Sequence, residues 1–282
     1  GNGYFITARG NAPVDYEVQF LQVTREQEPV AMLFSHGTHP AQASHSLIDA
    51  GHPGYAMDKI EATFPGVLAM YSDASGGNQF PRQPADWQTR VAAARQAGAG
   101  AYDALLEARA RELGHELAEA VTGIARRPLR NVTGPITSSI EVVGLPLAAP
   151  ISRVEALALA ENYPPDVGFV HYPHEHRGSN WIRMLLRYYE EGIPFPTKTT
   201  EMVCTDDTFL IHKTDQEFLD RYDGQLHDAY PCTYNEVIVA RLGPMPIVAM
   251  QGEICAPIGA RIKDVFRHDR PIMLFGYMGE HN

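Results

Sequence analysis

The chain is poor in cysteine, in basic residues and in long apolar runs. Its 282 residues include three cysteines, Cys204, Cys232 and Cys255, which cannot all pair within one chain, so their number leaves the redox compartment open. No apolar run approaches the roughly 18 residues of a membrane-spanning helix, so no transmembrane segment is predicted. The net charge of −11 leaves no basic stripe for nucleic acid phosphates, and it argues against electrostatic docking on anionic membranes.

Short apolar runs alternate with helical patterns in the first part of the chain. Residues 30–35 and 66–71 are apolar with polar or turn-forming neighbours, which is typical of buried strands. Between them, residues 53–64 have the pattern of a helix with Pro53 in its first turn. A strand, a helix and a second strand make a βαβ unit, which predicts an α/β fold. We therefore expect a mixed β-sheet core flanked by helices, in a single domain over residues 1–282.

Further elements are expected on the same grounds. Turns at residues 26–28 and at Gly243-Pro244 predict two hairpins, and Gly98 with Gly100 predicts a break in the longest helical stretch. The other expected strands are residues 15–23, 134–147, 237–242, 246–250 and 272–275, and the other expected helices are residues 87–125, 152–162, 180–191, one after Thr214 and one from Pro257.

Polar side chains follow four of the predicted strands. These residues are His39, Asn78, Glu253 and His281, and they come from distant parts of the chain. Because open α/β folds bind ligands outside the carboxyl ends of their strands, we expect these side chains to converge in one site. Imidazole and carboxylate groups are ligands of catalytic zinc, which needs three protein ligands and an open position. The pattern therefore predicts a metal site at the carboxyl ends of the strands.

Each of these features also has a simpler structural interpretation. His36 and His39 are equally typical of turn histidines that bond the nearby backbone. The pair Gly76-Gly77 is expected to adopt positive φ and to bring backbone amides close to an anion or oxyanion, or else to form an ordinary turn. Glu253 either projects into a site or stabilises the start of the following helix.

A second histidine cluster occupies residues 171–177. His171, His174 and His176 stand with Glu175 within six residues, and these are the ligand types of a zinc site. Pro173 and the lack of any strand or helix period leave their geometry open. A loop facing solvent or substrate is the expectation here.

Short motifs at both ends of the chain carry a family resemblance. Four blocks in order resemble the neutral/alkaline ceramidase family: Thr38-His39-Pro40 with residues 46–56, then Gly76–Pro81, Val248–Glu253 and Phe275–Asn282. The resemblance is weak between about residues 85 and 230. It implies a Zn²⁺ ion held by His39, Glu253 and His281, the last standing where the family has a tyrosine.

The resemblance implies hydrolysis of an amide bond in an N-acyl, ceramide-like substrate. A zinc-activated water would attack the carbonyl, and the amides of Gly77 and Asn78, with the Asn78 side chain, would stabilise the oxyanion. His36 would act as a general base or as the partner of His39, or exchange roles with it. The family implies a secreted or periplasmic protein with a lipid-like substrate, and the oligomeric state is left open.

Two departures from the family favour other functions. Phe80 stands where the family has a serine, and nothing before Val30 matches an early histidine motif, so we expect the family domain to be incomplete at both ends. One alternative is a metal-free serine hydrolase that uses Ser75, although the chain lacks the usual nucleophile elbow. The other is a non-catalytic binding protein or an inactive remnant of the fold.

Overall fold

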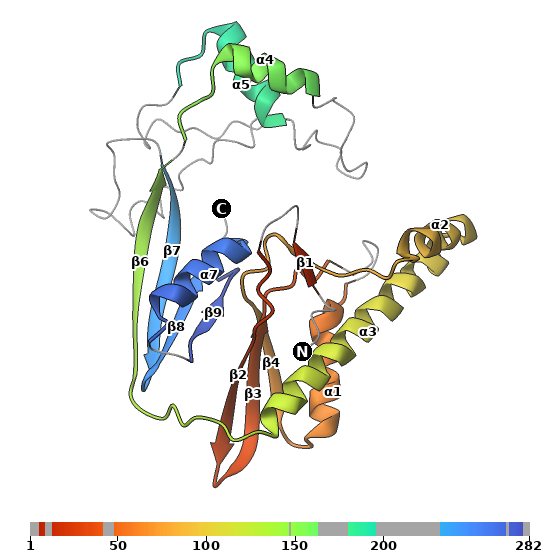
Figure 1. Cartoon of the computed structure of the whole chain (residues 1–282), viewed down its shortest axis with the longest axis vertical. Helices are drawn as coiled ribbons and strands as arrows, with labels where there is room; N and C mark the ends of the chain where they lie inside the picture. Colours follow the sequence, from red (N-terminus) through yellow and green to blue (C-terminus); the bar gives the residue numbers. More distant parts are fainter. Residues whose placement is uncertain are drawn as a thin grey trace. The chain divides into compact units, whose positions relative to one another are not determined.

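The computed structural model describes residues 6–8, 13–41, 48–146, 148–162, 180–195, 232–268 and 271–278 (Figure 1). Contacts divide the chain into two compact units, one made of Gly1–Ile140 with Val237–His281 and the other mainly of Glu141–Glu236. The expectation of a single catalytic domain stays a prediction. The predicted α/β class with mixed sheets and flanking helices is confirmed.

The first unit contains a three-stranded sheet in the order β2-β3-β4. Its strands are β2 (Val18–Arg25), β3 (Glu28–His36) and β4 (Leu68–Asp73). The predicted hairpin joins β2 and β3 in antiparallel pairing, whereas β4 pairs parallel to β3 after the helix α1 (Gly51–Thr63). β3, α1 and β4 therefore form the predicted βαβ unit. β2 begins later than expected, and before it Asp15 bonds the side chains of Gln79 and Lys263 instead of joining the ladder.

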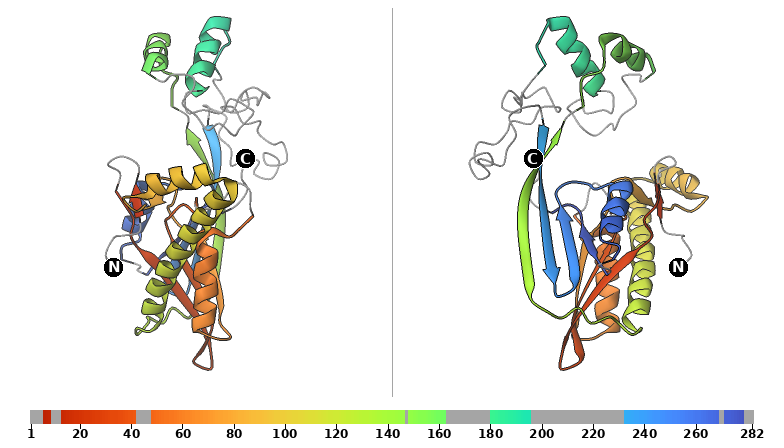
Figure 2. Two further views of the ribbon diagram at one scale, coloured as in Figure 1. Left: turned by 90° about the vertical axis from the view of Figure 1, so that its right-hand side faces the viewer. Right: turned by 60° about the vertical axis from the view of Figure 1, so that its left-hand side comes forward.

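The helix α1 and a second helix, α3 (Ala99–Ala125), cover one face of this sheet. The helical stretch predicted at residues 87–125 is two helices, α2 (Trp87–Ala97) and α3, and the break falls at Gly98, whose φ is +109°. Alternate residues of β3, Met32 and Phe34, pack with Ile60 of α1 and with Leu117 and Val121 of α3. α1 and α3 lie side by side in both views of Figure 2. The alternation of β3 thus places its even-numbered side chains under the helices.

The second sheet has the order β6-β7-β8-β9. Its strands are β6 (Ile136–Pro146), β7 (Cys232–Leu242), β8 (Met245–Met250) and β9 (Met273–Phe275). The predicted hairpin between β7 and β8 turns at Gly243, where φ is +54° and a side chain would meet the carbonyl of Thr133. β9 runs parallel to β8 after α7 (Ala256–Val265), which makes a second βαβ unit.

The two sheets meet through the free edge of β9. Gln19 of β2 donates from Nε2 to the carbonyl of Ile272 at 3.0 Å and accepts at Oε1 from the amide of Leu274 at 2.8 Å. Ser35 Oγ donates to the carbonyl of Leu274 at 3.1 Å. These buried side chains replace a strand partner, so the edge keeps no unpaired backbone group at Leu274. Leu33 packs on the apolar side chains of the second sheet beside them.

The remaining described elements are short. β1 (Ile6–Ala8) pairs with β5 (Gln79–Pro81), and α4 (Arg153–Asn162) packs on α5 (Asn180–Glu191) in the second unit. The capping box before α4 is confirmed, because Glu155 N donates to Ser152 Oγ and Ser152 N donates to the Glu155 carboxylate. Among the described residues, no helix is long and apolar enough to cross a membrane. The histidine cluster at 171–177 and the helix predicted after Thr214 lie outside the described residues.

Candidate functional site

The carboxyl ends of β3, β4, β8 and β9 meet in the first unit, as the sequence predicts. Backbone hydrogen bonds join them directly. Ala74 N donates to the carbonyl of His36 at 3.4 Å, and Gly276 N donates to that of Asp73 at 2.9 Å. Tyr277 N donates to the carbonyl of Gly252 at 3.0 Å, which ties the end of β9 to the loop after β8. Two parallel βαβ units thus bring their strand ends to one place.

His39 lies in contact with residues from two other strand ends. Its Nδ1 is 2.9 Å from the hydroxyl of Tyr277, and its amide donates to the carbonyl of Gln79 at 3.0 Å. The ring of Phe80 lies 5.6 Å from the imidazole ring between centroids. Hydrogen bonds at a ring nitrogen and at the backbone amide therefore position His39, and their partners follow β9 and β4.

Tyr277 is the site residue that the sequence reasoning missed. Its φ of +57° is unusual for a bulky residue, and such strain persists only where surrounding contacts enforce it. Burial and the nearby carboxylates of Asp73 and Glu253 raise the pKa of its phenol well above 10.0, so the hydroxyl stays protonated at neutral pH. The family resemblance implies His281 instead, and nothing in the local sequence signals a tyrosine at positive φ.

Gly77 brings the loop after β4 against the loop after β8. Its amide donates to the carbonyl of Ile254 at 2.9 Å, and a Cβ at this position would lie 2.8 Å from the carbonyl carbon of Glu253. The expected positive φ at Gly76-Gly77 is wrong, since neither glycine adopts it. The glycines are needed for close approach, Gly76 to the Asp73 carboxylate and Gly77 to the backbone of Glu253. Because the Gly77 amide is already bonded to Ile254, it does not supply the expected oxyanion donor.

Asn78 caps the helix that follows Glu253. Its Oδ1 accepts a hydrogen bond of 2.8 Å from the amide of Ala256, the first residue of α7. A backbone N–H only donates, so the side-chain oxygen must face the helix and the amide Nδ2 must face away from it. The residue expected to stabilise an oxyanion is therefore oriented by a helix from the other βαβ unit.

Three ionisable side chains near these strand ends, those of His36, His52 and Asp73, have shifted pKa values. Burial lowers the pKa of His36 to about 4, and its Nδ1 lies 2.7 Å from the Thr38 hydroxyl, so this imidazole is neutral. Burial likewise lowers the pKa of His52, on α1, to about 3. Burial raises the pKa of the Asp73 carboxyl to about 7. The Oδ2 atom of Asp73 is buried and has no hydrogen-bond partner among the described residues.

Two of the three predicted metal ligands lie in the described part of the chain. His39 and Glu253 follow β3 and β8, and Glu253 is exposed, whereas His281 lies outside the described residues. In the described part of the chain, no three His, Cys, Asp or Glu side chains are grouped closely enough to hold one ion. Ser75, the nucleophile of the alternative mechanism, is fully buried and its Oγ lies 3.3 Å from the Asp15 carboxylate. A buried serine bonded to a carboxylate does not reach a substrate, so the serine hydrolase alternative is not retained.

Neither the known family models nor the curated proteins include a match to this chain. Among solved structures, the chain is similar to a neutral ceramidase from Pseudomonas aeruginosa, at 16% identity with a TM-score of 0.49. It is also similar to a ceramidase complexed with C2, at 15% identity with a TM-score of 0.47. Each match covers 94% of this chain, which spans only 40% and 41% of the two ceramidase chains. Values this low assign no activity to this chain.

Proposed function

We propose that this chain carries the active site of a metal-dependent hydrolase that cleaves the amide bond of an N-acyl, ceramide-like substrate. The observation that supports it is the joining of four strand ends around His39, Glu253 and Asn78. An imidazole, a carboxylate and an amide donor, each carried by one of these joined segments, are the groups that metal-assisted amide hydrolysis requires. The ceramide-like substrate follows from the sequence motifs, and the secreted or periplasmic location remains an expectation of the same kind.

The donor chemistry of the site fits zinc. His39, Glu253 and His281 would hold the ion, and their nitrogen and oxygen atoms are those that Zn²⁺ prefers in catalytic sites. The chemistry that a bound zinc ion supplies is activation of a water molecule and polarisation of the amide carbonyl. The buried Oδ2 of Asp73, which has no donor among the described residues, places a further acceptor near these strand ends.

Three other side chains, those of Tyr277, Asn78 and His36, would orient the metal ligands or stabilise the oxyanion. Tyr277 holds the ring of His39 through Nδ1, so His39 would bind a metal through the other ring nitrogen, Nε2. Asn78 would donate from Nδ2 to the oxyanion, since its Oδ1 is occupied by the amide of Ala256. Of the roles considered for His36, burial favours that of a partner over that of a general base, because a neutral ring with a pKa of about 4 accepts a proton poorly at pH 7.

The test is an amidase assay that follows release of a labelled acyl chain from an N-acyl sphingosine, combined with elemental analysis of the purified protein. We expect about one zinc per chain, and activity that a chelator removes and added Zn²⁺ restores. His39→Ala and Glu253→Gln are each expected to lower kcat/KM by at least about a hundredfold.

His268→Ala is the matched control, because His268 is an exposed histidine in the turn that follows α7. This variant should keep the parent activity and metal content. Full activity in His39→Ala, or activity that the chelator leaves unchanged, would overturn the metal-dependent mechanism. Zinc binding without any amidase activity would favour the alternative of a non-catalytic binding protein.

A further inference from the structure

One face of α7 lies against the loop that carries Asn78. The buried residues of this helix are Ala256, Gly259 and Lys263, which are three and four positions apart and so share one face. Ala256 is capped by Asn78, and a Cβ on Gly259 would lie 2.5 Å from the side chain of Ser75. Two contacts therefore bind the first half of α7 to the loop 75–78, and Lys263 remains as the charged residue of the same face.

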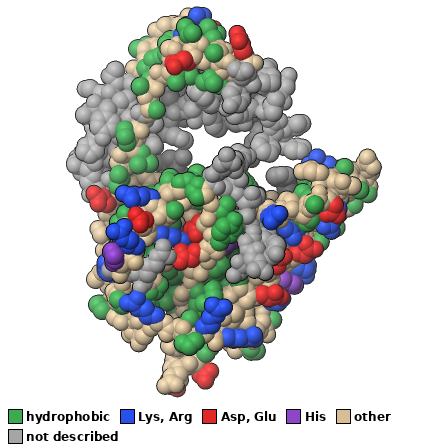
Figure 3. Space-filling view, viewed as in Figure 1, with side chains coloured by type: hydrophobic (Ala, Val, Ile, Leu, Met, Phe, Trp, Pro, Cys, Tyr) green, Lys and Arg blue, Asp and Glu red, His purple; other side chains and the backbone are tan. Residues whose placement is uncertain are grey.

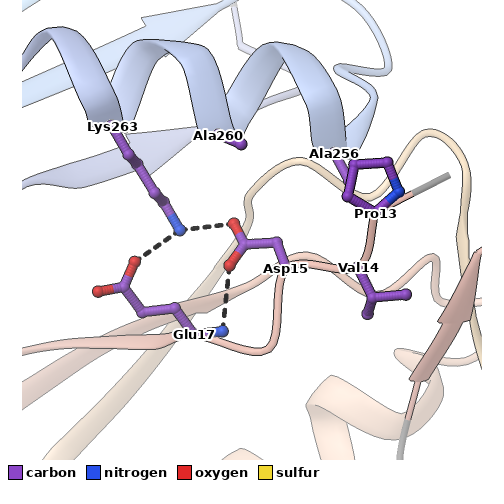
Figure 4. A pocket seen from close by; sticks show the side chains of 7 residues that line it. All are labelled: Pro13, Val14, Asp15, Glu17, Ala256, Ala260 and Lys263. Atoms are coloured by element: carbon purple, nitrogen blue, oxygen red, sulfur yellow. Dashed lines mark hydrogen bonds and ion pairs between the residues drawn. The ribbon is translucent and has the colours of Figure 1, made fainter.

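Lys263 forms a buried ion pair with the segment before β2. Its side chain is 5% exposed, and its Nζ donates to Asp15 at 2.5 Å and to Glu17 at 2.7 Å, as Figure 4 shows. A cavity of about 220 Å³ separates much of residues 13–17 from α7. The ion pair therefore connects the segment before β2 to α7 beside this cavity. Elsewhere, on the face in Figure 3, side chains of both charge signs are interspersed at the surface.

Asp15 links Lys263 to residues of the candidate site. Its Oδ2 lies 3.3 Å from the Ser75 hydroxyl, and its amide donates to Oε1 of Gln79 at 2.6 Å. Gln79 is fully buried, and its Nε2 donates to the carbonyls of Gly37 at 2.7 Å and Ser75 at 2.8 Å. The carbonyl of Gln79 accepts the amide of His39 at 3.0 Å. Gln79 thus holds together the segment that carries His39 and the loop that carries Asn78.

We propose that Lys263 is a positioning residue: by holding Asp15 against Ser75 and Gln79, it fixes the loop of Asn78 relative to His39. This inference rests on the proposed function. A buried ion pair is directional, and breaking it leaves charges without partners, so such a pair sets one position of a segment more strictly than apolar contact does. The residue acts through Asp15 and Gln79 and touches no reacting group.

The test compares Lys263→Met, Asp15→Asn and the double variant with the parent. Lys263→Met removes the ammonium at similar size, and Asp15→Asn removes the carboxylate charge while its backbone bond to Gln79 is kept. We expect each single variant to lower kcat at least about tenfold with a smaller change in KM, because the geometry of the transition state is disturbed more than substrate binding. The double variant should be no worse than the poorer single variant, since both act in one network. Asp15→Asn also covers the case in which Lys263→Met does not fold.

Amide hydrogen exchange supplies a readout that does not depend on activity. The amide of His39, bonded to Gln79, should exchange at least about tenfold faster in both single variants, while the amides of α3 keep parent rates. Lys59→Met is the matched control, because Lys59 pairs with Glu119 at 3.0 Å on the exposed side of the same unit, and it should change neither quantity.

Parent kcat and parent exchange at His39 in both folded variants would overturn the inference. Uniformly faster exchange, α3 included, would also overturn it, since the ion pair would then serve only global stability. A parent protein without amidase activity would refute the proposed function instead, and exchange at His39 would then decide the inference by itself.

Discussion

Replacing Gly77 with alanine tests the close approach of two strand-end loops. The added Cβ would lie 2.8 Å from the carbonyl carbon and 3.2 Å from the Cβ of Glu253. Normal contact between carbon atoms begins near 3.5 Å, so the loops after β4 and β8 must separate by roughly 0.7 Å or more. Gly77 has a φ that alanine also adopts, so backbone strain adds nothing to the effect.

The expected magnitude follows from overpacking and from displacement of the site. Forcing an extra methyl group into a packed contact costs about 1–3 kcal/mol, and the hydrogen bond from Gly77 to Ile254 weakens with it. Because the shift moves Glu253 relative to Asn78, we expect kcat to fall about tenfold to a hundredfold, in line with the cost of misplacing a catalytic group by roughly 1 Å.

Urea denaturation measures the loss of stability, the amidase assay measures the fall in kcat, and zinc titration measures the displacement of Glu253 as a ligand. Gly123→Ala is the matched control, since Gly123 lies in α3 and a Cβ there meets nothing within 4 Å. That substitution should leave zinc affinity unchanged and raise stability by up to about 1 kcal/mol, because alanine is the better helix former. Parent stability together with parent zinc affinity in Gly77→Ala would show that the two loops do not meet as described.

Three further predictions concern other parts of the site. His52 should destabilise the protein in acid, because its pKa is about 3 in the folded state and 6.5 ordinarily. Between these two pH values the unfolded chain binds more protons than the folded one, so the free energy of unfolding falls as the pH drops below 6.5. At pH 5.0 the loss of stability amounts to about 2 kcal/mol. Urea titrations at pH 7.5 and 5.0 should show this loss in the parent protein and not in His52→Gln, and equal pH dependence in both proteins would contradict the prediction. Asn78→Ala should lose about 0.5–2 kcal/mol with the cap of α7, whereas Asn78→Asp should keep that stability and still lower kcat, because it keeps the acceptor and lacks the donor; unchanged kcat in Asn78→Asp would remove the oxyanion role. His281→Ala should weaken zinc binding at least tenfold, about 1.4 kcal/mol, in a zinc titration, and equal affinity would exclude His281 as a ligand.

Most of the fold in the described part follows from local patterns. The β3-α1-β4 unit, the hairpins at residues 26–27 and at Gly243, the break at Gly98 and the capping box at Ser152 all depend on residues near one another in sequence. The convergence of strand ends was predictable too, because parallel strands in βαβ units end at the same edge of a sheet. The details that involve partners from distant segments were not predictable in this way.

The pair Gly76-Gly77 illustrates what local sequence patterns do not predict. The sequence alone indicates a glycine pair after a strand, which is typical of positive φ, but the structure uses both glycines to admit Asp73 and Glu253 at close range. The partner of Gly77 lies far along the chain, and its distance depends on how two sheets pack. The same holds for Asn78, whose helix cap comes from α7 in the other βαβ unit.

The sequence by itself determined most of the secondary structure of the described regions, the α/β class and the positions at which polar residues follow strands, because these depend on side-chain periodicity and turn chemistry. Tertiary structure alone decided that Tyr277 bonds His39, that Gln79 joins two site segments and that Lys263 is buried with Asp15. These contacts depend on the packing of two sheets against each other and on the burial that shifts the pKa values of His36 and Asp73. Burial and long-range contact have no local sequence signature, since they arise only when distant segments exclude water together.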